Sequence, residues 1–534
     1  MKEIRHFDWI IIGSGFGGSV SALRLVEKGY NVLMLEKGRR FQKEDFPKTN
    51  WNLRDWMWNP SVGLRGIFKM SFFKHVTVLS GVGVGGGSLV YANTLPTPTD
   101  EFFNADSWSH LADWKEELAP HYETASKMLG ATENPFQTYG DRILEEIAKD
   151  LGREEHIHPT KVAVFFGEPD KEVEDPYFEG EGPSRIGCTF CGACMTGCRT
   201  GAKNTLDRNY LYLAEKQGLE LLAEREVISV EPQENGGYKV VATDAFGMFK
   251  KSYSFTANKV IFAGGVLGTV PLLLEMKKHD HYLPNLSKHL GDFVRTNSEA
   301  LLGIVAPQSK EEFHKGIAIT SIFHPDEYSH IEPVRYGAGS DFFRLLSLPH
   351  APGENIFSRV FGSFKEFFKR PALLLRAFFV RDFAKKSQIL LYMRTLEGTL
   401  SFRLGRSIMT GFSKGLVTTL EDPKAAPKAF MEEATDLAER FAEKINGVPV
   451  GLLTETFLGV PSTAHILGGC VMGDDEQTGV IDSKHRIFGY DGLYIIDGSA
   501  MSANPGVNPS LTITALAERA MQFIPKKSEL SSNR

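Results

Sequence analysis

The apolar residues near the start of the chain follow strand spacing, then helical spacing, then strand spacing again. Residues 9–12 (WIII) form a short, continuous apolar run, which is typical of a parallel strand buried on both faces. After a glycine-rich turn, apolar residues recur at helical spacing between 20 and 26, and Gly29 can end that helix in a left-handed cap. A second apolar run covers residues 31–35. The pattern predicts a strand–helix–strand unit.

The turn inside this unit has the glycine spacing of a dinucleotide site. Gly13 permits the tight turn, Gly15 lets a pyrophosphate approach the backbone, and Gly18 lets the helix pack closely on the strand. Free N–H groups and the helix dipole favour an anion at this helix N-terminus. Glu36 stands 18 residues after the last glycine and is expected to bind a ribose hydroxyl pair. The unit predicts a bound dinucleotide but does not distinguish NAD from FAD.

A second glycine cluster and two alternating stretches extend this picture. Residues 81–88 (GVGVGGGS) let backbone amides approach a bulky ligand with no Cβ in the way, and the apolar run after them favours an ordered loop. Residues 389–393 and 399–404 alternate between apolar and polar positions, which predicts sheet strands in a substrate domain.

Length and charge narrow the class of protein. A chain of 534 residues is long enough for two or three domains. The net charge of −6 argues against nucleic-acid binding. The longest uncharged apolar run, residues 260–274, is too short to span a bilayer and contains Gly and Pro. The start of the chain enters a strand at once and has no cleavable signal, so we expect a cytoplasmic protein.

Four of the five cysteines form one cluster. Cys188, Cys191, Cys194 and Cys198 have the x2, x2, x3 spacing of ferredoxin-type iron–sulfur ligation, without the proline that commonly follows. This spacing suits a 4Fe–4S or 3Fe–4S cluster better than a single zinc ion, although zinc-bound or unliganded thiols remain alternatives. Cys470 is either a remote ligand or, as its LGGC setting favours, part of the dinucleotide site.

Several phrases of the sequence resemble the glucose–methanol–choline (GMC) oxidoreductases, and within them the cholesterol-oxidase-like branch. The resemblance is carried by SVSALRL (19–25), GVGGGSLV (83–90), AHILGGCVMG (464–473), LYIIDGSAM (493–501) and GVNPSLTITALAER (506–519). Residues 260–265 and 272–274 resemble the family's central flavin-domain strand and helix. The dinucleotide implied by this resemblance is FAD.

The resemblance also implies the fold and its division into domains. We expect an α/β (α+β) protein with a Rossmann-like FAD-binding domain and a sheet-based substrate domain. The FAD-binding domain is predicted to be discontinuous, comprising residues 1–100, 185–285 and 455–534. The substrate domain is predicted to comprise residues 101–184 and 286–454.

The family's cofactor-binding residues are carried over onto matching positions of this chain. The adenosine half of FAD is expected near Gly13 to Glu36. The resemblance places the remaining cofactor-binding residues near the isoalloxazine or beside the ribityl-pyrophosphate, and these are Gly83, Gly86, Ser88, Asn93, Asp497 and Gly498.

Two residues match the family's catalytic positions. Hydride transfer from an alcohol carbon to flavin leaves an oxygen that must lose a proton, and a histidine of near-neutral pKa can accept it. His465 matches the catalytic histidine, and Asn508 matches the active-site asparagine that hydrogen-bonds beside it. Where cholesterol oxidases commonly have His-Pro, this chain has His465-Ile466, for which we expect only a local backbone change.

A glutamate of the substrate domain serves the cholesterol oxidases in isomerising the ring double bond. Glu332 lies in the corresponding region of this chain. It is either that base or a solvated strand acid, and the second reading is the simpler one.

Residues 342–386 form an unusual basic, phenylalanine-rich insertion. They hold ten of the 38 phenylalanines, and residues 344–386 hold nine Lys or Arg against three Asp or Glu, a local charge of +6. Four phenylalanines between 357 and 368 stand at helical spacing. Such a stretch can lie in a membrane interface, cover the substrate pocket as a lid, or be an ordinary helix with a solvated basic face.

These expectations together favour oxidation of a bulky apolar alcohol, with a 3β-hydroxysteroid as the first candidate implied by the resemblance. If the cysteines hold a cluster, a dehydrogenase that passes electrons to a protein or quinone is favoured over an oxidase that uses O2. A GMC-type lyase and a membrane-surface electron carrier are the other candidates. The cysteine run argues against the lyase, and the presence of both His465 and Asn508 argues against the carrier.

Overall fold

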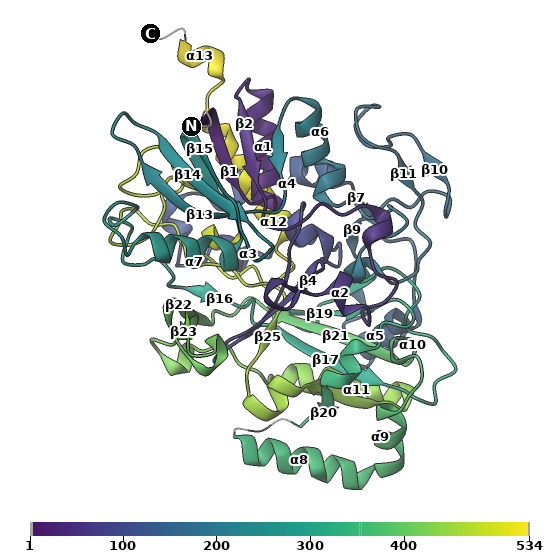
Figure 1. The fold of residues 1–534 in the computed structure, drawn as a ribbon. Coiled ribbons are helices and arrows are strands. Elements are labelled where there is room, and N and C mark those ends of the chain that lie inside the picture. Colours follow the sequence, from purple (N-terminus) through teal and green to yellow (C-terminus); the bar gives the residue numbers. More distant parts are fainter. Residues whose placement is uncertain (1–3, 352, 354, 532–534) are drawn as a thin grey trace.

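In the computed structural model, which describes residues 4–351, 353 and 355–531, two large sheets each build a hydrophobic core (Figure 1). The predicted α/β class is confirmed, with a parallel arrangement at the centre of the first sheet. Both termini lie at the end of the molecule formed by the first sheet (Figure 1).

The first sheet contains the predicted strand–helix–strand unit. Its order is β12-β2-β1-β15-β14-β13, with β26 also paired to β15. Its strands are β1 (Arg5–Ile12), β2 (Val32–Leu35), β12 (Glu220–Leu222), β13 (Arg225–Pro232), β14 (Tyr238–Asp244), β15 (Ser252–Phe262) and β26 (Leu493–Ile495). Because β1 lies between parallel neighbours on both sides, Ile10 and Ile11 are fully buried, as the continuous apolar run predicts. The chain leaves β1 at the glycine turn and enters helix α1 (Phe16–Glu27).

The second sheet forms the platform of a separate core. Its order is β20-β24-β17-β21-β19-β18-β8. Its strands are β8 (Ile157–Pro159), β17 (Ala300–Val305), β18 (Ser321–Phe323), β19 (Ser329–Val334), β20 (Ser347–Pro349), β21 (Ser387–Arg394) and β24 (Val448–Leu452). The apolar sides of α5 (Tyr139–Asp150) and α11 (Glu432–Ile445) pack on it. The predicted strand 389–393 is confirmed within β21.

The predicted strand 399–404 is confirmed within β22, but it does not join the second sheet. It lies in a three-stranded sheet of β16 (Val294–Arg295), β22 (Thr399–Arg406) and β23 (Lys414–Thr419). Leu400 and Phe402 of β22 are buried in the first core, so this small sheet extends that core.

The helical segment after residue 100 also differs from the predicted division into domains. Helices α3 (Asp100–Phe103) and α4 (Trp114–Met128) belong to the first core, and α4 packs along α12 (Ser510–Gln522). The rings of Trp108 and Trp114 stack with centroids 4.3 Å apart and are fully buried. Arg519 of α12 lies over the ring of Trp114, with its Cζ 4.7 Å from the ring centroid, a contact that the predicted boundary after residue 100 did not foresee.

The remaining elements are short or connect the two cores. The other strands are β3 (Trp58–Asn59), β4 (Leu64–Arg65), β5 (Phe68–Phe72), β6 (Thr77–Gly81), β7 (Ala131–Glu133), β9 (Lys161–Ala163), β10 (Glu172–Val173), β11 (Arg185–Ile186) and β25 (Ser462–Thr463). The other helices are α2 (Leu53–Trp56), α6 (Tyr210–Lys216), α7 (Val266–Met276), α8 (Ile356–Lys369), α9 (Pro371–Phe378), α10 (Phe383–Lys386) and α13 (Lys527–Ser531). Within the described ranges, no helix is both long and apolar enough to cross a bilayer.

Candidate active site

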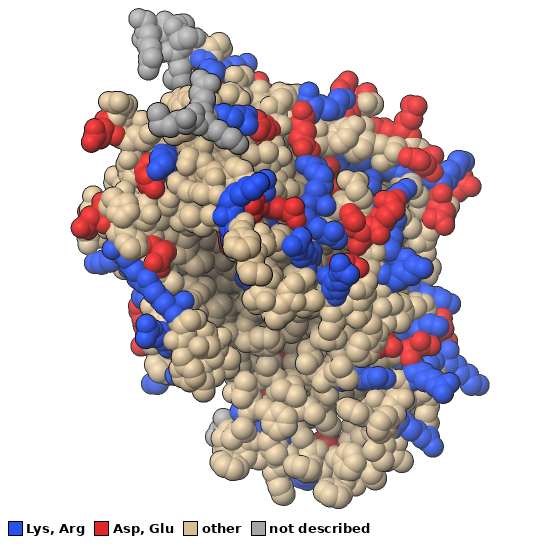
Figure 2. All heavy atoms as spheres, viewed as in Figure 1, with Lys and Arg blue, Asp and Glu red and all other residues tan. Residues whose placement is uncertain are grey.

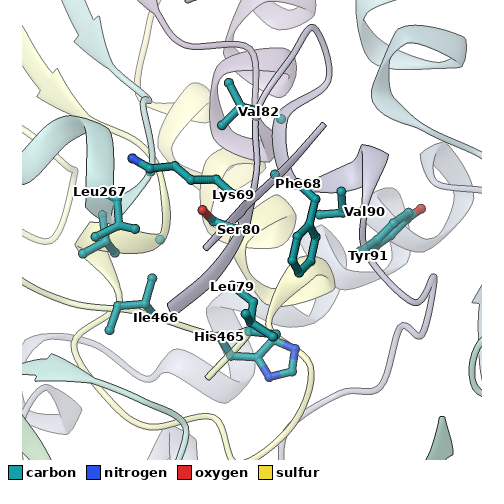
Figure 3. Close-up of a pocket in the computed structure, with 18 of the residues that line it drawn as sticks. Phe68, Lys69, Leu79, Ser80, Val82, Val90, Tyr91, Leu267, His465 and Ile466 are labelled. Atoms are coloured by element: carbon teal, nitrogen blue, oxygen red, sulfur yellow. The ribbon is translucent and has the colours of Figure 1, made fainter. Parts of the chain in front are cut away.

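One cavity of about 770 Å³ extends from the first glycine turn to the second sheet. At one end it is lined by the turn after β1 and by Glu36, and at the other by side chains such as Ile319, Val334 and Leu391. His465 and residues 79–81 of β6 also line it (Figure 3). Its length and its mostly apolar far end suit a large cofactor with an apolar molecule placed against it.

The three glycines of the first turn allow the close approaches that such a cofactor needs. Gly13 has φ +103°, and a Cβ on it would lie 2.4 Å from the carbonyl oxygen of Ala263. A Cβ on Gly18 would lie 2.2 Å from the oxygen of Gly13, which shows how closely the helix approaches the strand. Gly15, by contrast, has no atom nearer than 3.9 Å to such a Cβ and lines the cavity. The space beside Gly15 therefore suits a pyrophosphate at the start of α1.

Glu36 is buried at the end of β2 and lines the cavity. Its carboxylate accepts hydrogen bonds from the backbone and hydroxyl of Ser14, at 3.0 and 2.8 Å, and from the N–H of Gly38 at 2.8 Å. Burial raises the pKa of Glu36, and these hydrogen bonds oppose the rise. The carboxylate is held in place at the adenosine end, where the sequence predicts a ribose.

The second glycine cluster lies directly against the first turn. Gly86 has φ +52°, and a Cβ on it would lie 2.7 Å from the Cα of Gly15. Gly86 lines the cavity, whereas Gly83 and Ser88 do not. The hydroxyl of Ser88 donates to Gly85 O and accepts from Leu206 N, so it holds the loop in shape from behind. A Cβ on Gly83 would meet Leu89 and Phe41 side chains.

Asp497 and Gly498 line the cavity between its two ends. One oxygen of Asp497 accepts from Thr269 Oγ1 at 2.6 Å and Gly265 N at 2.8 Å, and the other accepts from Ser499 N at 2.8 Å. Gly265 has φ +69° and open space where a Cβ would stand. The open space beside Gly265 and the two glycine-rich turns fit an extended dinucleotide such as FAD.

His465 is held by a carboxylate that the sequence did not reveal. Its Nδ1 lies 2.5 Å from Glu299 Oε2, and Glu299 also accepts a hydrogen bond from Ala464 N. Glu299 is fully buried directly before β17. Burial alone would lower the pKa of His465, but the charge and hydrogen bond of Glu299, with the charge of Glu332, raise it above its usual value. With Nδ1 bound to the carboxylate, Nε2 is the nitrogen free to act as a base.

Asn508 lines the same cavity as His465 and is likewise hydrogen-bonded to a buried acid. Its Nδ2 donates to Glu332 Oε2 at 3.3 Å, and its Oδ1 has no hydrogen-bond partner among the described residues. Glu332 is fully buried in β19, with His330 Nε2 3.4 Å from its other oxygen, and does not line the cavity. The reading of Glu332 as a solvated strand acid is therefore wrong: it supports Asn508 from behind.

The four clustered cysteines line a second, small cavity of about 20 Å³. All four are free thiols, and no group of three or more Cys, His, Asp or Glu among the described residues is arranged to hold a metal ion. Burial raises the pKa of Cys194 to about 11, while hydrogen bonds from Thr200 and backbone N–H groups outweigh burial and lower the pKa of Cys198. The four thiols predicted to bind an iron–sulfur cluster thus line one cavity, but they are not arranged as a set of metal ligands.

The thiol cavity lies close to the large cavity. Lys203 is buried between the two, and it donates to Leu89 O at 3.0 Å and Cys194 O at 2.9 Å while its Nζ lies 4.7 Å from the centre of the Tyr91 ring. Tyr91 and Met195 line the large cavity. Asn93 is fully buried and does not line the large cavity, and its side-chain amide lies against the thiol of Cys194, where it opposes the rise in the pKa of that thiol.

Cys470 is separate from this cluster. It is buried in the first core and lies near Asp497 and Ser499. Its place supports the reading of LGGC as part of the dinucleotide site rather than as a remote cluster ligand.

Sequence reasoning also missed Lys69 of β5. It lines the cavity, and its side chain extends toward Leu267 (Figure 3). Burial lowers the pKa of Lys69 to about 8. Nothing in the alternating sequence FKMSF indicates that the charged end of this lysine faces the cavity.

We expect Glu299→Gln to change the pH dependence of the reaction. The amide keeps the size of the side chain but removes the charge that raises the pKa of His465, so burial would lower that pKa. Because the base must be unprotonated, the acidic limb of kcat/KM should move to lower pH, and the plateau rate should fall about tenfold or more. The measurement is anaerobic flavin reduction against pH, with the surface variant Glu312→Gln as control. An unmoved acidic limb would rule out this role for Glu299.

Comparisons with known proteins agree with this geometry. Models of the GMC oxidoreductase family match residues 184–290 and 416–517, and a model of the NAD(P)-binding Rossmann-like domain matches residues 11–42. The chain is 43% identical to a cholesterol oxidase of Acinetobacter baumannii, over 98% of this chain and 95% of that protein. It is equally similar to a cholesterol oxidase of Mycobacterium tuberculosis, over 98% and 92% of the two chains.

More distant proteins share the fold. A 2-methyl-1,2-propanediol dehydrogenase of Mycolicibacterium austroafricanum is 24% identical over 97% of this chain and 95% of its own. The solved structure of an Aspergillus oryzae formate oxidase matches with a TM-score of 0.62 at 12% identity, over 99% of both chains. The chain belongs to the GMC oxidoreductase family, in its cholesterol-oxidase-like branch, and is an FAD-dependent alcohol oxidoreductase.

Proposed function

We propose that this enzyme oxidises the 3β-hydroxyl of a sterol or a similarly bulky apolar alcohol. The observation that carries the proposal is the cavity itself, which is lined both by apolar side chains of the second sheet and by His465 and Asn508. The names of the two relatives that are 43% identical over nearly the whole chain point to the same substrate class.

In this proposal the chain's own residues position the alcohol and take its proton. Bound FAD supplies the acceptor for a hydride from the alcohol carbon. Nε2 of His465 accepts the hydroxyl proton, because Nδ1 is bound to Glu299. Asn508 Nδ2 has a second N–H besides the one donated to Glu332, and this N–H donates to the hydroxyl oxygen and orients the substrate. Glu299 and Glu332 act as positioning residues behind these two.

The residues for the cofactor follow from the shape of the cavity. Gly13 and Gly15 would hold the pyrophosphate, Glu36 the ribose, and Gly86 with Asp497 and Gly498 the flavin half. Gly18, which does not line the cavity, would serve the site by letting the helix lie close to the strand. Gly83 and Ser88, which do not line the cavity, would support the loop that carries Gly86. Asn93 does not line the cavity either, and it would support the wall formed by its neighbours Ala92 and Thr94 from behind.

As a second proposal, the four thiols hold an iron–sulfur cluster that serves an electron acceptor such as a protein or quinone. Its support is that all four line one cavity beside Lys203, and that the neighbouring Met195 lines the flavin cavity. The thiols as placed do not form a ligand set, so binding of a cluster would require their side chains to turn. Without a cluster, the flavin would be reoxidised by O2.

One anaerobic sample tests both proposals. We expect the flavin absorption to bleach when a detergent-solubilised 3β-hydroxysteroid is added, and the same steroid with its hydroxyl replaced by hydrogen to leave it unchanged. Absence of bleaching with steroid alcohols would refute the first proposal. Iron and sulfide assays with the visible spectrum before substrate decide the second: flavin bands alone, without stoichiometric iron, would exclude the cluster.

A further inference from the structure

Helix α8 carries a row of phenylalanines that face away from the protein. Phe357, Phe361, Phe364 and Phe368 are 83%, 72%, 60% and 76% exposed. At 100° per residue they fall within an arc of about 60° on the helix surface. Proteins rarely expose four aromatic side chains in one row to water, so this surface is a candidate binding surface.

The opposite side of α8 fixes the helix to the substrate domain. Arg359 is buried and donates to Thr456 O at 2.9 Å and Gly353 O at 3.1 Å. Phe367 packs against a small core that includes Val448 and Val450. The exposed row is therefore held in a defined orientation by the inner face of the same helix.

The apolar surface continues onto the next helix. In α9, Leu375, Phe378 and the adjoining Phe379 are 48%, 51% and 71% exposed. Together with the four residues of α8 they form what we call the phenylalanine surface. α8 and α9 lie at the end of the molecule opposite the termini (Figure 1), and the visible face there shows few charged side chains (Figure 2).

Basic side chains border the phenylalanine surface. Lys365 and Lys369 lie along one side of the row on α8, and Arg370 and Arg376 follow it. Lys369 pairs with Glu366, whereas Lys365, Arg370 and Arg376 make no ion pair with any described residue. Aromatic rings bordered by unpaired cations match the boundary between acyl chains and anionic headgroups.

We propose that the phenylalanine surface docks on an anionic lipid bilayer. The rings of α8 and α9 enter the headgroup–acyl boundary, and the basic residues contact lipid phosphates. Segments on both sides of these helices, including Ser347 and Phe383, line the substrate end of the large cavity. Docking would therefore bring that end near the lipid in which an apolar alcohol dissolves, a point that rests on the proposed function.

The test is vesicle flotation of the full chain with FAD bound. Phosphatidylcholine vesicles with and without phosphatidylglycerol are compared for the native protein and for Phe361→Ser/Phe364→Ser. Met248→Ser/Phe249→Ser is the matched control, because it removes two apolar side chains that are each 91% exposed in the turn between β14 and β15. We expect binding to require phosphatidylglycerol, to weaken with salt, and to fall at least about tenfold in the α8 variant only.

The other outcomes overturn the proposal. One is that the native protein does not float, and another is that the α8 and control variants float equally. A third is a native dimer that binds no vesicles and becomes a monomer in the α8 variant. That result would identify a second copy of the chain as the partner. Flavin reduction by detergent-solubilised steroid is measured without vesicles. Its failure alongside intact flotation would refute the proposed substrate and leave the docking surface standing.

Discussion

Replacing His465 by alanine is expected to slow anaerobic flavin reduction by about 10²- to 10⁴-fold while FAD stays bound. The imidazole lines the cavity and its Nδ1 is bound to Glu299, so its removal takes away the group that we propose as the base for the hydroxyl proton. The glycine turns and Asp497, which we assign to the cofactor, are untouched. The readouts are the flavin-to-protein ratio and the rate of bleaching by substrate in a stopped-flow instrument.

His75→Gln is the control for this variant. His75 hydrogen-bonds to Thr418 Oγ1 at 2.9 Å and does not line the cavity. We expect its bleaching rate to match that of the native protein. A His465→Ala enzyme that reduces its flavin at the native rate would show that the proton leaves by another group.

Gly86→Ala is expected to yield protein that is largely free of FAD. The new Cβ would lie 2.7 Å from the Cα of Gly15, and neither atom can move without displacing one of the two glycine turns. Because both turns border the cavity where the cofactor lies, we expect FAD affinity to fall about tenfold or more, on top of the cost of the left-handed φ. The measurement is the flavin absorbance of the purified protein and FAD titration of the apoprotein.

Gly152→Ala separates the two causes. Gly152 has φ +64°, similar to Gly86, but nothing lies within 4 Å of its added Cβ. It should lose some stability and keep its FAD. If both variants retained FAD equally, the close approach of the two turns would not matter for cofactor binding.

The parts of the fold that were predictable from sequence are those set by neighbouring residues. The run 9–12, the glycines that follow and the helix up to Gly29 are fixed by local burial and backbone conformation, and the structure has them as predicted. The helical spacing of the phenylalanines in 357–368 likewise appears as α8. Residues 352 and 354, which also belong to the predicted insertion 342–386, lie outside the described residues.

What the sequence could not reveal depends on contacts between distant segments. Glu299 and His465 are 166 positions apart, and an acid before an apolar run does not show which ring it will meet. Ser88 stands in a glycine cluster that borders the cavity, yet its hydroxyl turns back to Gly85, which only the path of the loop decides. The packing of α4 on α12 is another such case. Aromatic residues in a sequence indicate that a segment will be buried, but they do not indicate which element it will pack against.

The two side chains that we propose to contact the substrate are each bound to an acid from the other half of the molecule. His465 and Asn508 belong to the segments of the first core, while Glu299 precedes β17 and Glu332 lies within β19 of the second sheet. A small displacement of one half against the other would break both pairs at once, with each core still folded. The turnover rate should therefore depend on the relative position of the two halves. On heating, we expect activity to be lost at a lower temperature than the unfolding temperature of either core.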